Sequence, residues 1–426
     1  MKIGIIGAGF TGLSAGYELS KKGHDVTIFE ASKIPGGLAT GFKNKKWKWE
    51  LESHYHHLFK TDYEIQRLAK EVDHKIIFVR PKTSTFYKDV IMQIDSPLSL
   101  MKFKHLSLQS RIRTGTVLAY LKITNNWKPL EKITAKKFLI KTMGEDSWKV
   151  LWQPLLEKKF GQYSTQIPAS WFWARVKSRT AVLGYPEGGF DKFAQKICQE
   201  IKKNKGEVLF EKKVLKILNK KKKIYIKIGG GERYAFDKVI CTLPTNLFTK
   251  ITSGLPDNYL RSAARFSGIG ATNLVLVLSK SFLDDGTYWL NINEAKYPFL
   301  AIVEHTNFMN SKNYGKEKII YIGNYLENNN KYFLMSDKEL LKEYLPYLKK
   351  INKRFSKSWI KRIYLAKAFF AQPIIVKNYS KKVLPFKTPI KNLFLANIQQ
   401  VYPWDRGTNY AVELGRRVAK EVLLND

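Results

Sequence analysis

The chain has 426 residues, 44% of them hydrophobic and 13% aromatic, so it is long enough to bury a large core and to form two domains. Its two cysteines, Cys198 and Cys241, exclude a disulfide framework, lack the spacing of a metal or redox pair, and favour a reducing cytoplasm. The formal net charge of +38 is extreme for a small-molecule enzyme, and the absence of an apolar run of about 18 residues argues against a membrane-spanning helix.

The first residues of the chain carry its most specific pattern. Residues 2–6 are typical of a buried strand, and residues 7–12 follow with the sequence Gly-Ala-Gly-Phe-Thr-Gly. Residues 13–22 predict a helix, and residues 25–29 predict a second strand that ends at Glu30. A lone G-x-G-x-x-G is weak, but strand, glycines, helix, strand and acid in this order indicate a dinucleotide site. The same glycines interrupt the apolar N-terminus and argue against a signal peptide.

Each part of this pattern has a chemical reason. Gly7 permits a tight turn, Gly9 lets a pyrophosphate approach the backbone, and Gly12 allows the helix and the strand to pack closely. The N-terminus of the helix offers amides and a partial positive charge to the phosphates. Glu30 lies where a carboxylate accepts hydrogen bonds from the adenosine ribose, and its charge disfavours the 2′-phosphate of NADP.

The rest of the chain alternates predicted helices and strands without internal repeats. Helices are expected at 61–73, over most of 96–160, in 186–204 and at 337–352. Strands are expected at 76–93, 207–211, 213–218, 223–228, 232–236, 237–244, 270–280 and 299–304, and Lys220–Lys223 is expected at a hairpin tip. The chain closes with a strand at 393–397, a loop at 402–407 and a helix at 409–424.

The positive charge leaves several interpretations open. In one interpretation the positive charge is spread over solvated faces and needs no partner. In another it attracts the protein to an anionic membrane surface. Nucleic acid is disfavoured as a partner because no recognisable basic and aromatic module is present. The segment from Leu106 to Leu121 mixes Arg111, Arg113 and the following Lys122 with apolar residues. It predicts either a helix packed on a core or a basic amphipathic helix that lies on a membrane or lines an apolar tunnel.

Four motifs together resemble a known superfamily. They are the glycine motif of residues 7–12, Glu30 with Gly36-Gly37-Leu38, the segment 184–190 (Gly-Tyr-Pro-Glu-Gly-Gly-Phe), and residues 392–397 followed by 406–412. In order and spacing the chain resembles the FAD-dependent amine oxidase and protoporphyrinogen oxidase-like flavoproteins. Its domain order is also similar to that of UDP-galactopyranose mutase.

The resemblance implies an α/β fold, in which a Rossmann-like FAD-binding domain is interrupted by an inserted α+β substrate domain. The implied FAD-binding domain is discontinuous and comprises residues 1–75, 186–245 and 385–426. Residues 76–185 and 246–384 would then form the substrate-binding domain.

The resemblance also implies FAD in an extended pose. The glycine motif would meet the pyrophosphate, Val214 the adenine, and the N-terminal amides of the last helix, at residues 410–412, the flavin ring. The cofactor-binding residues implied in this way are Gly7, Gly9, Phe10, Thr11, Gly12, Glu30, Ala31, Gly36, Gly37, Leu38, Val214, Asn397, Asn409, Tyr410 and Ala411.

The chain departs from the amine oxidase pattern beside the double glycine. Arginines are usual there in amine oxidases, whereas this chain has Ser32, Lys33 and Ala39. An amino acid or polyamine substrate is therefore disfavoured relative to an isoprenoid, a tetrapyrrole or a sugar conjugate.

The candidates for chemistry beyond the flavin are histidines and one arginine. His54, His56 and His57 do not fall on one side of a helix or a strand, so a metal site is disfavoured. By the resemblance this stretch lies near the flavin, where one of His54, His56 and His57 would contact the flavin or protonate the substrate, with His56 and His57 as the candidates for catalysis; a structural role is the alternative. His305 follows a predicted strand and is a candidate base, and Arg406 is a candidate ligand of an anionic substrate group or a partner of Asp405.

The expected function is FAD-dependent oxidation of a lipid-like, isoprenoid or other large substrate by hydride transfer to the flavin. The expected location is the cytoplasm, with a peripheral position on the inner face of the membrane as the alternative. One alternative is a non-redox enzyme similar to UDP-galactopyranose mutase. Another is an isoprenoid-binding carrier similar to the Rab GDP-dissociation inhibitors, which share the fold without flavin chemistry.

Overall fold

A five-stranded parallel sheet draws its strands from both ends of the chain. The computed structural model describes residues 1–220 and 223–424, so part of the expected tip at Lys220–Lys223 lies outside the described residues. The strand order is β10-β2-β1-β14-β20, and every pairing is parallel. β1 and β2 are buried along most of their length, as expected for a sheet that is covered on both faces. The bounds are β1 (Lys2–Ile6), β2 (Asp25–Phe29), β10 (Glu207–Leu209), β14 (Lys238–Cys241) and β20 (Leu393–Leu395).

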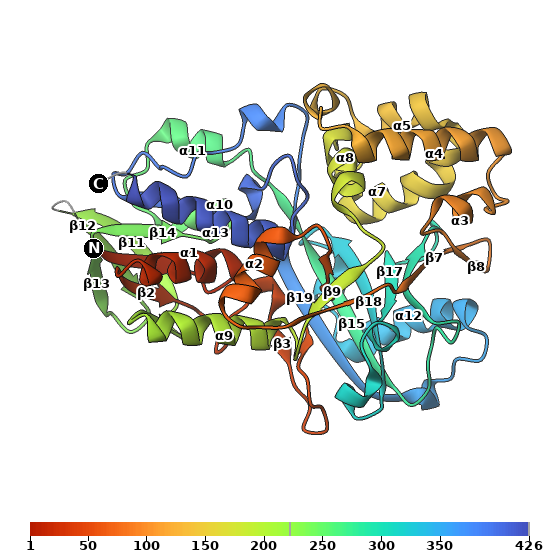
Figure 1. The fold of residues 1–426 in the computed structure, drawn as a ribbon, viewed down its shortest axis with the longest axis horizontal. Helices are drawn as coiled ribbons and strands as arrows, with labels where there is room; N and C mark the ends of the chain where they lie inside the picture. Colours follow the sequence, from red (N-terminus) through yellow and green to blue (C-terminus); the bar gives the residue numbers. More distant parts are fainter. Residues whose placement is uncertain (221–222, 425–426) are drawn as a thin grey trace.

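Helices cover one face of this sheet (Figure 1). α1 lies against both α9 and α13, and α13 also contacts α2. The approach of α1 to α13 requires Gly415, because an added Cβ would overlap the carbonyl oxygen of Thr11. In the same contact the Ser14 hydroxyl donates to the Val412 carbonyl at 3.0 Å. The bounds are α1 (Phe10–Lys21), α2 (Tyr63–Glu71), α9 (Phe190–Lys203) and α13 (Thr408–Leu423).

An ion-pair cluster fastens α13 to its neighbours. The Arg416 guanidinium group is nearly buried and contacts three carboxylates, Glu18 on α1 and Glu64 and Glu71 on α2. The helix that closes the chain is thereby tied to the helix that opens it.

The opposite face of the parallel sheet is covered by a small antiparallel sheet and two helices. Ile6 and Phe29 pack there in one cluster with Ile217, Ile226 and Phe248. The covering elements are β11 (Val214–Lys220), β12 (Lys223–Ile228), β13 (Arg233–Phe236), α10 (Thr245–Ile251) and α11 (Asp257–Ala263).

The second half of the molecule is built on a seven-stranded mixed sheet of order β19-β15-β18-β17-β16-β7-β8. Its pairings are antiparallel except for that of β16 with β7. α12 packs against β15 and β19 and begins with a capping box between Ser336 and Glu339. The bounds are β7 (Lys82–Tyr87), β8 (Val90–Gln93), β15 (Gly268–Leu278), β16 (Thr287–Ile292), β17 (Ala301–Glu304), β18 (Lys318–Leu326), β19 (Ile360–Pro373) and α12 (Asp337–Ile351).

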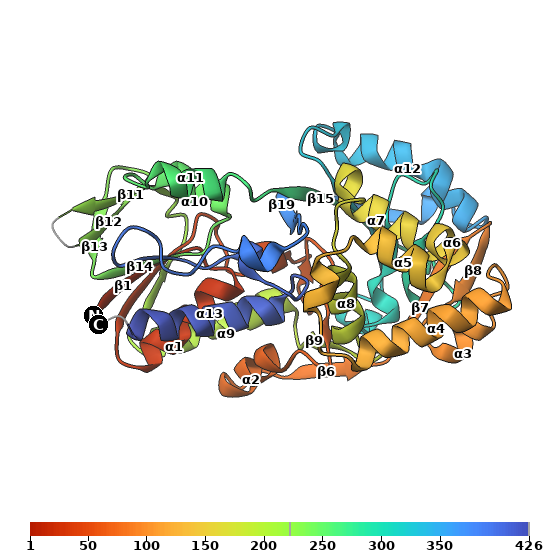
Figure 2. The same cartoon turned by 90° about the horizontal axis from the view of Figure 1, so that it is seen from above.

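A helical layer lies beside this sheet (Figure 2). Its core contains the fully buried side chains of Trp171, Phe172 and Trp173 on α8. The helices are α3 (Pro97–Met101), α4 (Leu108–Ile123), α5 (Ala135–Met143), α6 (Glu145–Ser147), α7 (Gln153–Phe160) and α8 (Ala169–Ser178). Two small sheets join the halves, one of β3 (Gly41–Phe42) and β4 (Leu51–Glu52), the other of β5 (Leu58–Phe59), β9 (Leu183–Pro186) and β6 (Ile76–Val79).

The predicted α/β fold class with a Rossmann-like sheet is confirmed. The helix after the glycine motif begins at Phe10 and not at Leu13, because Gly9 already serves as its N-cap residue. Among the described residues, no helix has the length and apolar character needed to cross a membrane.

Candidate functional site: a cavity between the two halves

A cavity of about 520 Å³ lies between the parallel sheet and the second half of the molecule. One wall comes from the glycine motifs and the N-terminus of α13. The other comes from α7, α8 and the strands β15, β16 and β18. Residues from the beginning, middle and end of the chain therefore meet in one place. Predicted site residues in its lining are Gly7, Gly9, Phe10, Thr11, Glu30, Gly36, Gly37, Leu38, His56, His57, Arg406, Asn409, Tyr410 and Ala411.

Two glycine loops lie side by side at one end of the cavity. The amide of Gly36 donates to the Ala8 carbonyl at 2.9 Å, and a Cβ added to Gly37 would lie 3.1 Å from the Gly9 Cα. Gly7 and Gly36 have φ values of 102° and 115°, which L residues with side chains rarely adopt. Beside Gly9 an added Cβ would meet only the Gly37 Cα, at 3.8 Å. The loops thus leave an uncovered backbone surface at the N-terminus of α1, which suits a phosphate group.

Glu30 holds the first glycine loop. One carboxylate oxygen accepts from the Ala8 amide at 2.7 Å, and the other accepts from the amide and hydroxyl of Ser32 at 2.8 Å and 2.9 Å. Glu30 also lines the cavity. Because a carboxylate has about four acceptor sites, it can accept further hydrogen bonds from a ligand.

The N-terminus of α13 faces the same cavity. The amide of Ala411 donates to the Gly407 carbonyl at 3.0 Å, which is the first hydrogen bond of the helix. The amides available to a ligand are therefore those of Thr408, Asn409 and Tyr410, two residues earlier than the expected 410–412. The Asn409 side chain lines the cavity, and its oxygen accepts from the Ile65 amide at 3.1 Å.

The three neighbouring histidines all line the cavity and point to separate partners. The Asn273 amide group donates to His54 Nδ1 at 2.5 Å, and His56 Nδ1 donates to the His54 carbonyl at 2.6 Å. His57 Nδ1 shares a hydrogen bond with the Tyr288 hydroxyl at 3.1 Å. Burial lowers the pKa of His54 to about 3, of His56 to about 4 and of His57 to about 3, so all three are neutral at pH 7.

Four cationic side chains, none of which belongs to the glycine motifs, line the cavity together with Asp405. Lys159 lies on α7, Arg175 on α8, Arg179 just after α8, and Arg406 in the loop before α13. The Lys159 ammonium lies 3.4 Å from the Asp405 carboxylate.

Burial disfavours the charged forms of Lys159, Arg175 and Arg179. It lowers the pKa of Lys159 to about 7, with Asp405 acting against the shift, and lowers that of Arg175 to about 9. Burial also disfavours the charged form of Asp405, but Lys159 and Arg406 hold the pKa of this carboxyl group at about 2. One carboxylate thus faces up to four cations, and this end of the cavity favours an anionic group.

Arg406 makes its contacts on the second half of the molecule. Its Nε donates to the side chain of Gln372 at 2.9 Å, and its guanidinium group contacts the hydroxyl of Tyr325. The alternative partner, Asp405, accepts instead from the backbone amide of Arg406 at 3.0 Å.

Lys159, Arg175 and Arg179 were missed by sequence reasoning because the chain contains 74 lysines and arginines. A sequence pattern that could have indicated a cationic site is the four-residue spacing of Arg175 and Arg179 at the end of α8, a helix rich in aromatic residues. The lining also has an apolar and aromatic part, with side chains from Phe59, Leu155, Trp289, Leu300, Phe370 and Tyr410, and a polar part that includes Asn273, Asn291 and Asn324.

Five predicted site residues do not line the cavity. His305 is buried beyond the end of β17, where its Nε2 shares a hydrogen bond with the Tyr314 hydroxyl at 2.7 Å. In this position His305 lies outside the cavity lining, and its Tyr314 contact fits the structural alternative. The neighbouring carboxylate of Glu304 is likewise engaged, by Ser281 and two backbone amides.

The other four residues lie behind or beside the cavity lining, outside the lining itself. An added Cβ at Gly12 would overlap the carbonyl oxygen of Gly7, so Gly12 acts by allowing close packing. Val214 is buried in the core behind the parallel sheet. The Asn397 amide group donates to the Leu243 carbonyl at 2.9 Å. Ala31 follows Glu30 without reaching the lining.

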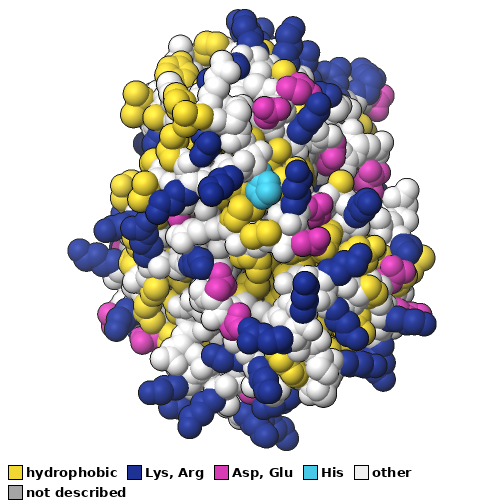
Figure 3. Space-filling model, turned by 90° about the vertical axis from the view of Figure 1, so that its right-hand side faces the viewer, with side chains coloured by type: hydrophobic (Ala, Val, Ile, Leu, Met, Phe, Trp, Pro, Cys, Tyr) yellow, Lys and Arg dark blue, Asp and Glu magenta, His cyan; other side chains and the backbone are white. Residues whose placement is uncertain are grey.

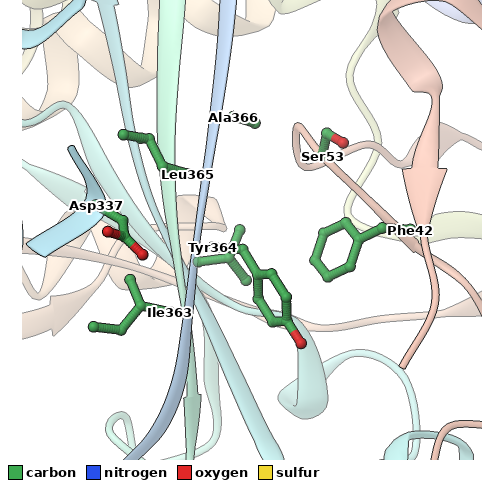
Figure 4. A pocket seen from close by; sticks show the side chains of 8 residues that line it. Phe42, Ser53, Asp337, Ile363, Tyr364, Leu365 and Ala366 are labelled. Carbon is green, nitrogen blue, oxygen red and sulfur yellow. The ribbon is translucent and has the colours of Figure 1, made fainter. Parts of the chain in front are cut away.

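A second hollow, of about 420 Å³, lies at the edge strand β19 (Figure 4). Ile363 and Leu365 point to one side of the strand, toward Asp337, and Tyr364 points to the other, toward Phe42. Successive side chains of a strand alternate in this way, so these residues do not converge on one ligand. Among residues 1–220 and 223–424, no group of three or more His, Cys, Asp or Glu side chains is placed to hold a metal.

This chain belongs to the family of flavin containing amine oxidoreductases, whose sequence model matches residues 10–423. Over 45 residues it is 51% identical to an L-amino-acid oxidase of Bothrops pauloensis, a match that covers 11% of this chain and 9% of that protein. Over 82 residues it is 34% identical to a hydroxysqualene dehydroxylase of Zymomonas mobilis, which covers 19% of this chain and 20% of the relative.

The whole fold is shared with solved structures. One is that of reduced UDP-galactopyranose mutase, with a TM-score of 0.80 over 99% of this chain and 95% of the other, at 15% identity. Similarity at that level of identity concerns the fold alone.

Proposed function

We propose that the cavity binds FAD in an extended pose and that the protein is an FAD-dependent oxidoreductase. The observation that carries this proposal is the meeting of three separate elements: the double glycine cradle, Glu30 and the N-terminus of α13. The cradle would hold the pyrophosphate, and Glu30 would accept from the adenosine ribose. When bound, FAD would supply the acceptor for a hydride.

The chain's own groups would position this cofactor and exclude water. The amides of Thr408, Asn409 and Tyr410 and the positive end of the α13 dipole would stabilise negative charge on the flavin ring. His56 and His57 would contribute as neutral groups, because burial keeps them unprotonated at pH 7. Their proposed role is therefore hydrogen bonding to the cofactor or substrate.

The substrate we propose is a large, mostly apolar molecule that carries an anionic group. The apolar and aromatic part of the lining would take its body, and the cations near Asp405 would take the anion. Arg175 and Arg179 are the strongest candidates, because among the described residues their guanidinium groups have no hydrogen bond or ion pair and lie over the rings of Trp171 and Phe59. The name of the hydroxysqualene dehydroxylase relative supports an isoprenoid body.

This proposal is tested by anaerobic reduction of the FAD-loaded protein with paired ligands, each an isoprenoid alcohol and its phosphate ester. Bleaching of the flavin should be faster and saturate at lower concentration with the phosphate. Arg179→Met should weaken that preference at least tenfold, as expected for one charge-assisted interaction of about 1.5–3 kcal/mol.

The matched control is Arg354→Met, because Arg354 is an exposed arginine that pairs with Asp284 far from the cavity lining. This variant should keep the wild-type preference. Equal reduction by alcohol and phosphate in the wild type would contradict the anionic part of the proposal.

A second function fits the same cations. A nucleotide sugar carries two phosphates, and guanidinium groups bind phosphate in a bidentate manner. A non-redox mutase would require reduced flavin and would return the substrate with no net oxidation. Turnover that depends on a reductant and forms no oxidised product would favour this candidate.

A further inference from the structure

The outward side of α3 and α4 is apolar where a solvated helix would be polar. α4 has sixteen residues and buries only Ser110, Thr114 and Leu121. Exposed instead are Leu108 at 56%, Ile112 at 52% and Ile123 at 75%, together with Leu98 of α3 at 67%. Members of the α4 set recur at spacings close to multiples of a turn, so they form one stripe along the helix.

The segment that carries this stripe is basic and contains no acidic residue. Between residues 96 and 130 there is no aspartate or glutamate. Figure 3 shows the corresponding side of the molecule, with hydrophobic side chains gathered at the upper left and Lys and Arg side chains around them. The six basic residues of this segment are Lys102, Lys104, Arg111, Arg113, Lys122 and Lys128.

The helix is fixed in this orientation by its own basic side chains. Arg113 Nε donates to the Thr142 carbonyl at 3.1 Å, and Arg111 donates to the Met101 carbonyl. The apolar stripe is therefore held outward in the folded protein. Exposed apolar side chains with a basic rim are the pattern of a helix that lies in a membrane interface.

The same helix is tied to the wall of the cavity. Lys122 Nζ donates to the carbonyls of Lys177 at 3.0 Å and Arg179 at 2.6 Å. The Arg179 guanidinium lies over the ring of Phe59 at 5.5 Å, and both residues line the cavity. The end of α4 is thus connected to the cavity wall by a single contact, that of Lys122 with Arg179.

We propose that α3 and α4 form a docking surface for a membrane that carries anionic lipids. Leu98, Leu108, Ile112 and Ile123 enter the interfacial region, and the basic rim binds the headgroups. The chemistry favours a lipid surface over nucleic acid, because apolar side chains occupy the centre of the surface. Docking there brings the bilayer next to the cavity, so that a lipid-like substrate enters from the membrane; this last step rests on the proposed function.

The test is cosedimentation of the full-length protein with vesicles of phosphatidylcholine, with and without phosphatidylglycerol, over a range of salt concentrations. Binding should require phosphatidylglycerol and weaken as salt rises. Ile112→Ser/Ile123→Ser should lower the partition coefficient at least tenfold, because two apolar side chains leave the interface. The matched control, Leu334→Ser/Leu247→Ser, removes exposed apolar side chains elsewhere and should bind as the wild type does.

A separate pair of variants tests whether the basic residues of the docking surface contribute to vesicle binding. Lys102→Gln/Lys104→Gln should lower the partition coefficient about 30-fold at low salt, since each lysine near such a surface changes it about fivefold. Lys349→Gln/Lys350→Gln removes the same charge from the exposed end of α12 and should have much less effect.

The proposal would be overturned by the absence of binding to anionic vesicles at low salt, or by equal losses of binding in the surface and control variants. Retention on RNA that survives Ile112→Ser/Ile123→Ser, without vesicle binding, would also overturn it. The experiment needs no substrate and no turnover. Vesicle binding by a protein without oxidase activity would therefore leave the docking surface standing while the proposed function fails.

Discussion

Replacing Gly9 with alanine separates cofactor binding from folding. Gly9 has φ −71° and ψ 171°, a conformation open to any L residue. A Cβ there meets no atom closer than the Gly37 Cα at 3.8 Å. The protein without cofactor should therefore fold normally, with a free energy of unfolding unchanged or raised by about 0.4–1 kcal/mol.

The affinity for FAD should fall in Gly9→Ala, although the stability of the protein does not. The added methyl group would stand on the uncovered backbone between the two glycine loops, where the pyrophosphate needs to approach. Losing one or two charge-assisted hydrogen bonds costs about 3 kcal/mol in total. The Kd for FAD should therefore rise about a hundredfold.

The assay is titration of the cofactor-free protein with FAD, followed by quenching of flavin fluorescence, together with urea unfolding of the same preparations. Gly115→Ala is the matched control. Its added Cβ would likewise meet no atom closer than 3.8 Å, in this case a Leu100 side-chain carbon, and Gly115 lies on α4, outside the cavity lining. This control variant should bind FAD as the wild type does. A Gly9→Ala protein that folds and binds FAD with unchanged affinity would refute the assignment of this loop to the pyrophosphate.

Three further predictions concern single side chains. Arg416→Met should lower the free energy of unfolding by about 2–3 kcal/mol in urea titrations, because three carboxylates on α1 and α2 lose their shared partner; Arg417→Met, at an exposed pair, should stay within about 0.5 kcal/mol. His57 has a pKa of about 3 in the folded protein and about 6.5 in the unfolded chain, so below pH 6.5 only the unfolded chain takes up its proton. The free energy of unfolding should therefore decrease as the pH falls from about 6.5 toward 3. In His57→Asn it should decrease less between pH 7 and pH 5 than in the wild type. Anionic ligands should bind more weakly as pH rises through about 7, where Lys159 loses its proton, and Lys159→Met should abolish this step in titrations of ligand affinity against pH.

The parts of the fold that were predictable are those encoded locally. The opening strands of residues 2–6 and 25–29 match β1 and β2, because a short apolar run bounded by glycines leaves few alternatives. The closing helix was predictable from its apolar face, and begins one residue earlier than expected. The proposed domain boundaries remain predictions, although strands from both ends of the chain do share one sheet.

The site was only partly predictable because tertiary packing assembles it. The glycine motifs and Glu30 are placed by one local β-α-β unit, so their position followed from the sequence. Lys159 and Asp405 are 246 residues apart, and no local pattern could have paired them. His305 was misleading, because a histidine at the end of a strand is equally able to face the core, where Tyr314 satisfies it.

The absorption spectrum of the purified protein, before and after denaturation, tests the central claim most directly. We expect a flavin spectrum in the folded protein and release of free FAD on unfolding. A protein that is colourless as purified and remains so after incubation with FAD would contradict both the oxidoreductase and the mutase proposals. It would favour a carrier of the same fold.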